Sequence, residues 1–175
     1  EVASDGSRAL LSLRFEPEKL QDDALINEFL SCYTNNLLKN PILFDGIVSL
    51  LELIRKKNFK WGVITNKPRE FTEKILDHHN LLNSIDVLIC GNDGYKTKPS
   101  PDMILEASSM MGLNVSDIVY IGDAQRDIDA ANAAGTMSIL ACYGYLKKSD
   151  IISEWGADRF IHAPLDLSEI FDLNH

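Results

Sequence analysis

Two acidic residues that follow a short apolar run are the first candidates for chemistry in this sequence. Asp123 comes directly after the run 118–122, and Asp127 lies four positions later, where a helical pattern resumes. Residues four apart share one face of a helix, so both carboxylates are expected to point toward the same crevice. Crowded carboxylates repel each other unless a cation lies between them, and Mg²⁺ prefers such oxygen ligands. An aspartate N-cap followed by a solvated acidic residue is the plainer alternative.

Other polar groups follow apolar runs earlier in the chain. Thr65 ends one run and leads into Asn66 and Lys67, where a hydroxyl and the next backbone N–H groups suit a phosphate oxygen. Lys98 lies in the proline-containing loop 92–101, which can hold its ammonium group in place. A hydroxyl, an ammonium group and metal-binding carboxylates together stabilise charge on a transferring phosphoryl group. A capped strand-to-helix turn and a solvated loop lysine remain the alternatives.

A framework of alternating strands and helices is expected to bring these groups together. From Pro41 onward, apolar segments typical of buried strands occur at residues 61–65, 87–90, 118–121 and 137–141. Amphipathic helical segments lie between and around them, at residues 47–56, 69–78, 102–111 and from about 124 to Gly135. The tail adds a short helix, strand and helix at 151–155, 159–161 and 167–171. This order predicts an α/β fold with a parallel sheet and helices on both faces, whose ligands bind at the carboxyl ends of the strands.

The first 40 residues have a different pattern. Helical segments are expected at 8–15 and 18–39, separated by Pro17. Asn40-Pro41 is a natural boundary, because the residue before a proline resists the helical region. We therefore divide the chain into a helical part, residues 1–40, and an α/β domain, residues 41–175.

Composition excludes some partners. With 26 acidic and 17 basic residues the formal net charge is −9, and no basic run offers to neutralise the phosphates of a nucleic acid. No run approaches the ~18 apolar residues needed to span a bilayer, and no signal peptide is recognised, so no membrane association is expected. Cys32, Cys90 and Cys142 are far apart and predict reduced, mostly buried thiols in a cytoplasmic protein.

In their order and spacing the polar motifs resemble those of the haloacid dehalogenase superfamily of phosphatases, and its phosphoglycolate phosphatase-like branch in particular. The matching segments are Val-Ile-Thr-Asn-Lys-Pro at 63–68, Lys-Pro-Ser-Pro-Asp at 98–102 and Ile-Gly-Asp-Ala-Gln-Arg-Asp at 121–127. The resemblance covers nearly all of the chain. It implies a Rossmann-like core, residues 41–175, with the remnant of a helical cap in residues 1–40. It also implies Mg²⁺-dependent hydrolysis of a small phosphorylated metabolite through an aspartyl-phosphate intermediate.

The resemblance also implies residue roles. Thr65 would hydrogen-bond the phosphoryl group with help from the backbone of Asn66, and Lys98 would neutralise the nucleophile and the phosphoryl oxygens. Asp123 would ligate Mg²⁺. Asp127 would act through water or by orienting Lys98.

One motif of the superfamily does not occur in the sequence. The nucleophile and the acid/base lie in an Asp-x-Asp-Gly-Thr motif after the family's first strand, and Ser4-Asp5-Gly6-Ser7 resembles it only superficially, because no apolar strand precedes it. We expect the first strand, the nucleophile loop and the opening cap helices to be missing from this chain. A gap is then expected between the strands that carry Thr65 and Asp123, to be filled by another segment or by a partner chain. The chain alone is expected to be inactive.

The substrate remains open between several possibilities. Trp61-Gly62, Tyr143-Gly144-Tyr145 and Trp155-Gly156-Ala157-Asp158 also resemble N-acetylmuramic acid 6-phosphate phosphatases. Arg8, on the cap remnant, would touch the carboxylate or sugar of the substrate, with a surface arginine as the alternative. A sugar phosphomutase of the same fold and a non-catalytic binding domain are the other readings.

Overall fold

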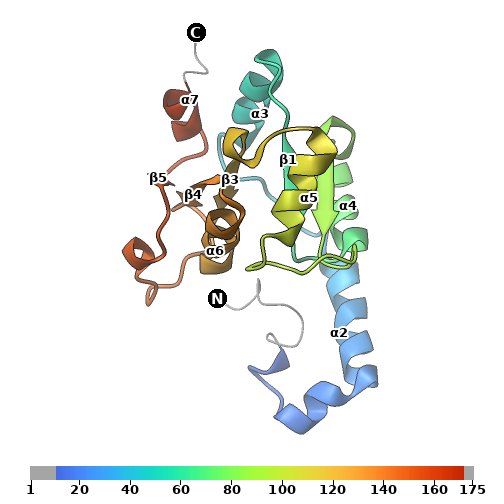
Figure 1. Cartoon of the computed structure of the whole chain (residues 1–175). Coiled ribbons are helices and arrows are strands. Elements are labelled where there is room, and N and C mark those ends of the chain that lie inside the picture. The colour runs from blue at the N-terminus through green and yellow to red at the C-terminus, as the bar shows by residue number, and fades with distance from the viewer. Residues whose placement is uncertain (1–10, 172–175) are drawn as a thin grey trace.

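The computed structural model describes residues 11–171, in which helices and strands alternate (Figure 1). The strands are β1 (Gly62–Thr65), β2 (Val87–Cys90), β3 (Val119–Gly122), β4 (Met137–Ala141) and β5 (Arg159–Ile161). The α-helices are α2 (Asp23–Asn36), α3 (Ile47–Lys56), α4 (Arg69–His78), α5 (Asp102–Met111), α6 (Gln125–Ala134) and α7 (Asp166–Ile170). Short 3-10 turns lie at η2 (Pro17–Gln21), η3 (Leu82–Ser84), η4 (Val115–Asp117) and η5 (Ile152–Glu154).

The expected α/β class is confirmed, with differences in some of the helices. The long helix predicted for residues 18–39 begins only at Asp23, because a 3-10 turn occupies Pro17–Gln21 and the Asp22 carboxylate then caps α2 by accepting a hydrogen bond from Ala24 N (2.9 Å). The short helix expected at 151–155 is the 3-10 turn η5. Of the helix predicted at 8–15, residues 11–15 fall among the described residues, and the prediction is wrong for residues 12–15, which form a turn instead of a helix.

The strands form two parallel sheets. One pairs β1 with β2, in register from Gly62 opposite Val87 to Thr65 opposite Cys90. The other has the order β3-β4-β5. Within residues 11–171, β1 and β3 are not paired with each other. The interruption therefore lies between the strands that end at Thr65 and just before Asp123, where the sequence predicts a gap.

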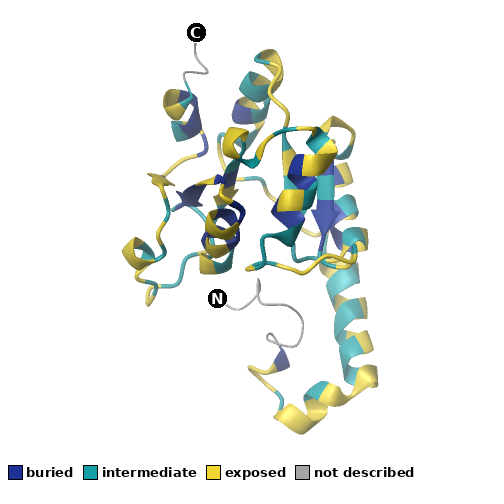
Figure 2. Cartoon of the chain, in the orientation of Figure 1, coloured by how far each residue is buried: buried dark blue, intermediate teal, exposed yellow. Residues whose placement is uncertain are grey.

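Helices cover both faces of the larger sheet. Ile139 and Ala141 on β4 pack with Leu50 of α3 and Leu167 of α7. On the opposite face, a second cluster joins α5, β3 and α6 through Ile104, Tyr120, Ala130, Ala131 and Ala134. A third cluster, Val87, Ile89, Met103 and Ala107, fastens α5 to β2. Figure 2 shows these buried residues concentrated in the strands and on the inner sides of the helices. The core thus fixes α5 against both sheets.

Helix α2 lies apart from this core. It contains no buried residue, and Figures 1 and 2 show it extending away from the strands. Its contact with the α/β part runs through Tyr33, whose ring meets Phe71 of α4 edge-on at 5.2 Å between centroids. The division of the chain at residue 40 stays a prediction. Arg8 lies outside the described residues.

The three cysteines differ in exposure: Cys90 is buried, Cys142 is half-buried and Cys32 is exposed, and all three are free thiols. The expectation of mostly buried thiols is therefore wrong for Cys32, which lies on the surface of α2. Among residues 11–171, no helix combines the length and the apolar character needed to cross a membrane.

Candidate active site

Lys98 lies at the meeting point of three elements. Its Nζ donates hydrogen bonds to the backbone oxygen of Ile64 in β1 (3.1 Å) and to the hydroxyl of Tyr120 in β3 (2.9 Å). It also forms an ion pair with Oδ1 of Asp127 in α6 (2.7 Å). The side chains of Lys98 and Asp127 are only 9% and 8% exposed. One ammonium group therefore links the two sheets and the first turn of α6.

The charges of Lys98 and Asp127 stabilise each other, with the Tyr120 hydroxyl as a further partner of Lys98. Burial lowers the pKa of Lys98, but Tyr120 and Asp127 outweigh that effect, so the pKa of Lys98 lies above its ordinary value of 10.5. Burial raises the pKa of Tyr120, so its hydroxyl stays neutral. Asp127 Oδ1 is buried and makes no hydrogen bond within the described residues, so its contact with Lys98 is an ion pair alone. Its Oδ2 accepts from Ala124 N (3.1 Å), which fixes the carboxylate at the start of α6.

The backbone of Lys98 is held by Asn66. The Asn66 side chain donates from Nδ2 to the Lys98 oxygen and accepts at Oδ1 from the Lys98 N–H, both at 3.0 Å. These reciprocal bonds join the loop after β1 to the loop after β2, across 32 residues of sequence. Gly91 lets the backbone of Asn66 come close to the end of β2, because a Cβ at position 91 would lie 2.1 Å from the backbone oxygen of Asn66.

Thr65 lies next to this cluster, at the end of β1. Its hydroxyl oxygen accepts a hydrogen bond from the N–H of Lys67 (3.1 Å), so the hydroxyl proton remains available for an anion. The backbone oxygen of Lys67 accepts from Gly91 N (3.0 Å), which ties this loop to the end of β2. Because Thr65 directly follows Ile64, its hydroxyl and the ammonium group of Lys98 belong to the same strand end.

Asp123 follows the neighbouring strand end of β3. Its Oδ2 accepts from Tyr145 N (2.9 Å), which orients the carboxylate. Residues 11–171 hold no cluster of three or more metal-ligating side chains, and Asp127 Oδ1 forms its ion pair with Lys98. The expectation that Asp123 and Asp127 share a cation stays a prediction. The donor set still fits Mg²⁺, which commonly takes one or two carboxylates and completes its shell with water and phosphate oxygens.

Sequence reasoning missed two residues of this site. Tyr120 was assigned only to the apolar run of β3, yet its hydroxyl contacts Lys98 and donates to the Ile64 oxygen (3.4 Å). Gly144 lies against Asp123, and a Cβ there would be 2.3 Å from the Asp123 Cβ. A polar hydroxyl in an otherwise apolar strand was the available signal for Tyr120. For Gly144 spacing gave none, because it lies 21 positions after Asp123 and the close approach is tertiary.

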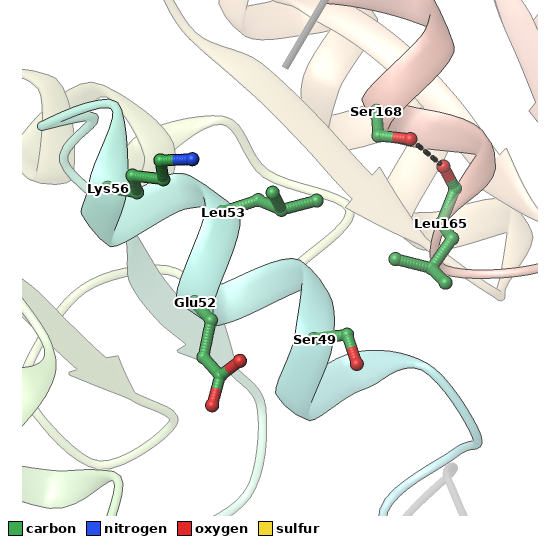
Figure 3. Close-up of a pocket in the computed structure, with 6 residues that line it drawn as sticks. All are labelled: Ser49, Glu52, Leu53, Lys56, Leu165 and Ser168. Atoms are coloured by element: carbon green, nitrogen blue, oxygen red, sulfur yellow. Dashed lines mark hydrogen bonds between the residues drawn. The ribbon is translucent and has the colours of Figure 1, made fainter. Parts of the chain in front are cut away.

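A hollow in the surface lies elsewhere, between α3 and α7 (Figure 3). It is lined by Ser49, Glu52, Leu53, Lys56, Leu165 and Ser168. In it, Ser168 Oγ donates to the Leu165 oxygen (2.7 Å), so this hydroxyl is bonded within its own helix. None of the lining residues belongs to the loops at the carboxyl ends of the strands. We therefore place the candidate site at Lys98 rather than in this hollow.

Comparisons with known proteins agree with this fold. The family of haloacid dehalogenase-like hydrolases matches residues 9–141. An N-acetylmuramic acid 6-phosphate phosphatase of Pseudomonas putida is 35% identical over 98% of this chain and 78% of its own length. A phosphoglycolate phosphatase of Xanthomonas campestris pv. campestris is 36% identical over 96% of this chain and 76% of its own length.

Solved structures show the same architecture. A predicted phosphoglycolate phosphatase from Haemophilus somnus 129PT superposes with a TM-score of 0.81 at 24% identity, covering 97% of this chain and 74% of that one. A hydrolase from Pseudomonas syringae gives a TM-score of 0.75 at 26% identity, covering 94% and 74%. The chain belongs to the haloacid dehalogenase-like hydrolases. The enzyme class expected from the sequence, a phosphatase of this superfamily, is confirmed.

Proposed function

We propose that the protein is a Mg²⁺-dependent phosphomonoesterase that acts on a small organic phosphate of the phosphoglycolate type. The observation that carries the proposal is the position of Lys98, which joins the strand ends carrying Thr65 and Asp123. The Thr65 hydroxyl and the backbone N–H of Asn66 would donate to phosphoryl oxygens. The fixed positive charge of Lys98 would offset the charge of the phosphoryl group and of the attacking carboxylate.

The remaining side chains would hold this arrangement. Asp127 and Asn66 would position the ammonium group and the backbone of Lys98, respectively. Asp123, itself oriented by Tyr145 N, would provide a carboxylate ligand for Mg²⁺. The bound ion would neutralise negative charge on the phosphoryl group during transfer.

We further propose that a strand bearing the carboxylate nucleophile lies between β1 and β3. Trp61 O accepts from Asp86 N next to β2 (2.9 Å), and peptide groups alternate along a strand, so Ile64 presents its carbonyl to the opposite edge. That edge of β1 has no partner strand among residues 11–171, and an open edge is a template for strand pairing. The strand would come from another segment of the natural protein or from a partner chain.

The range of candidate substrates is narrowed by the chemical groups common to the compounds in the relatives' names. Phosphoglycolate and N-acetylmuramic acid 6-phosphate appear in the names of relatives at 36% and 35% identity. In both compounds a phosphate esterifies an alcohol group, and the same molecule carries a free carboxylate. We therefore propose a phosphomonoester that also carries a carboxylate. Phosphoglycolate is the first candidate, and N-acetylmuramic acid 6-phosphate is the second, favoured by the 35% identity over 98% of this chain.

A screen of phosphorylated metabolites against the natural full-length protein tests the proposal. We expect Mg²⁺-dependent release of inorganic phosphate from phosphoglycolate or N-acetylmuramic acid 6-phosphate, with chelation by EDTA abolishing it. A sugar phosphomutase would instead show a kinetic lag that a bisphosphorylated activator removes. Absence of phosphate release from every ester, with Mg²⁺ present, would leave a binding domain as the better description.

A further inference from the structure

Lys67 has an environment that the phosphoryl site does not explain. Its Nζ lies 2.5 Å from the hydroxyl of Tyr33 in α2 and 5.1 Å from the centroid of the same ring. Arg69 and Lys98 form ion pairs with carboxylates, whereas Lys67 forms none within residues 11–171. This half-buried ammonium group is thus held by a neutral phenol, and its charge is not offset by a carboxylate of the described chain.

The backbone of Lys67 is fixed beside the phosphoryl site. Its N–H donates to the Thr65 hydroxyl oxygen, and its carbonyl accepts from Gly91 N. The Cα atoms of Thr65 and Lys67 can be at most about 7 Å apart, because two residues span no more than that. A ligand that places its phosphoryl group at Thr65 therefore lies within reach of the Lys67 side chain.

The ring of Tyr33 is held in place by two aromatic contacts. Its ring stacks on Phe29 at 6.4 Å between centroids and meets Phe71 edge-on at 5.2 Å. The hydroxyl of a tyrosine both donates and accepts hydrogen bonds. The Tyr33 hydroxyl, which accepts a hydrogen bond from Lys67, can therefore also donate one to an anion. Together, Lys67 and Tyr33 offer one positive charge and one neutral donor at the border between α2 and the end of β1.

We infer that Lys67 and Tyr33 form a subsite for the carboxylate of the substrate, on the side of the phosphoryl site that faces α2. The inference rests on the proposed function and adds the residues that select the substrate. The ammonium group would make a charge-assisted hydrogen bond to the carboxylate, with the Tyr33 hydroxyl as a second donor. A phosphate ester without a carboxylate would leave this polar pair without that partner and would bind more weakly.

Binding of two stable phosphonates to the natural full-length protein separates this subsite from the phosphoryl site. The probes are 3-phosphonopropionate, which carries a carboxylate, and propylphosphonate, which does not, with affinities measured by calorimetry in the presence of Mg²⁺. We expect the wild type to prefer 3-phosphonopropionate by at least about tenfold, the value of one hydrogen bond to a charged group. We expect Lys67→Gln to lose this preference while keeping its affinity for propylphosphonate.

Two variants complete the design. Lys74→Gln removes an exposed lysine of α4, the helix that follows Lys67, and is expected to keep the wild-type preference. Tyr33→Phe keeps the aromatic contacts and is expected to reduce the preference only in part. A preference that survives in Lys67→Gln overturns the inference, and so does an equal loss of affinity for both phosphonates.

Binding of the two phosphonates to the wild type separates the carboxylate subsite from the phosphoryl site. Binding of both phosphonates with equal affinity would overturn the carboxylate subsite and leave the proposed phosphatase intact. Binding of neither phosphonate would overturn the phosphoryl site itself, and the subsite with it.

Discussion

Lys98 combines a proposed catalytic role with a buried charge. An ammonium group that is 9% exposed is costly unless it is paired and hydrogen-bonded, and here a carbonyl, a phenol and a carboxylate surround it. The nearby Lys96 is exposed and lies in the same loop. The two lysines therefore form a natural pair for separating the effect of position from that of net charge.

We expect Lys98→Ala and Asp123→Asn each to lower kcat by at least about 100-fold in the natural full-length protein, because each removes a group proposed to offset phosphoryl charge. The measurement is Mg²⁺-dependent phosphate release from the best substrate of the metabolite screen. Lys96→Ala is the matched control and should keep nearly full activity. Full activity in either site variant would contradict the assigned role.

These two variants should differ in stability. Lys98→Ala leaves the buried Asp127 without its ion pair, which costs roughly 3–5 kcal/mol of unfolding free energy. Asp123→Asn keeps an oxygen for the Tyr145 N–H and should cost far less. Urea denaturation of both variants gives the comparison, and similar losses would contradict this account of Lys98.

Gly144 controls the position of Asp123. We expect Gly144→Ala to displace the Asp123 side chain, since the new Cβ would lie 2.3 Å from the Asp123 Cβ. The result should be a higher Mg²⁺ concentration for half-maximal activity. Titration of activity with Mg²⁺ measures this, alongside thermal unfolding to record any change in the fold. An unchanged Mg²⁺ requirement would show that this approach does not set the geometry of Asp123.

At the scale of elements, two loops carry the site and each is braced by specific bonds. Asn66 holds the loop after β1 to Lys98. Arg69, at the start of α4, forms an ion pair with Asp93 in the loop after β2 (2.6 Å), and the Asp93 carboxylate also accepts from Cys90 N (2.8 Å). The loop that delivers Lys98 is thus tied at its beginning to α4 and, at Lys98 itself, to β1.

The Arg69–Asp93 pair predicts a pH-dependent contribution to stability. The hydrogen bonds from Arg69 lower the pKa of Asp93 below 3.8, so the pair stabilises the fold at and above that pH and loses its effect as the pH falls through the lowered value. We expect Asp93→Asn to be less stable than the wild type at pH 6 and to approach it below pH 3.8. Urea denaturation across this range measures the difference, with Asp129→Asn, an exposed position on α6, as the control. A stability difference that does not change with pH would contradict the assignment.

Sequence periodicity predicted the elements better than their contacts. The helices Arg69–His78 and Asp102–Met111 and the strand Val87–Cys90 match the predicted ranges, because the apolar period and the flanking glycine and proline residues act locally. The start of α2 was missed because a 3-10 turn and a helix share the same apolar spacing over one turn. The bonds of Asn66 to Lys98 span 32 residues, and no local pattern encodes them.

The candidate site was predicted from three short motifs, and the structure places their strand ends around Lys98. The direction of Asp127 was not predictable from spacing alone. Spacing favoured a cation shared by positions 123 and 127, whereas the family resemblance implied that Asp127 acts through water or by orienting Lys98. The structure places the carboxylate of Asp127 against the ammonium group of Lys98. Spacing could not show this contact, because Lys98 lies in a loop that is distant in sequence.

At the scale of the whole molecule, the two sheets are joined by side chains and helices rather than by strand pairing. Lys98 and Tyr120 both bond the Ile64 carbonyl across the interruption, and α5 packs on both sheets. A strand inserted there would bring a nucleophile next to Lys98 and complete a continuous sheet.

This arrangement predicts the behaviour of the 175-residue chain on its own. We expect negligible hydrolysis of p-nitrophenyl phosphate, because the chain contains no Asp-x-Asp-Gly-Thr motif to supply the nucleophile. The natural full-length protein, assayed at the same concentration with Mg²⁺, is the reference. Turnover by the 175-residue chain at a comparable rate would mean that a carboxylate within it acts as the nucleophile, and would contradict the inserted strand.

The hydrogen bond from Lys98 to the Ile64 carbonyl has a consequence for when the enzyme becomes active. An ammonium group has three protons, of which Ile64 and Tyr120 accept two in hydrogen bonds, while Asp127 holds the charge through an ion pair. An N–H of an incoming strand would compete for the Ile64 carbonyl and release one proton of Lys98 toward the newly formed pocket. Catalytic competence would then arise only in the assembled enzyme, so that an incompletely assembled molecule neither binds nor consumes phosphorylated metabolites.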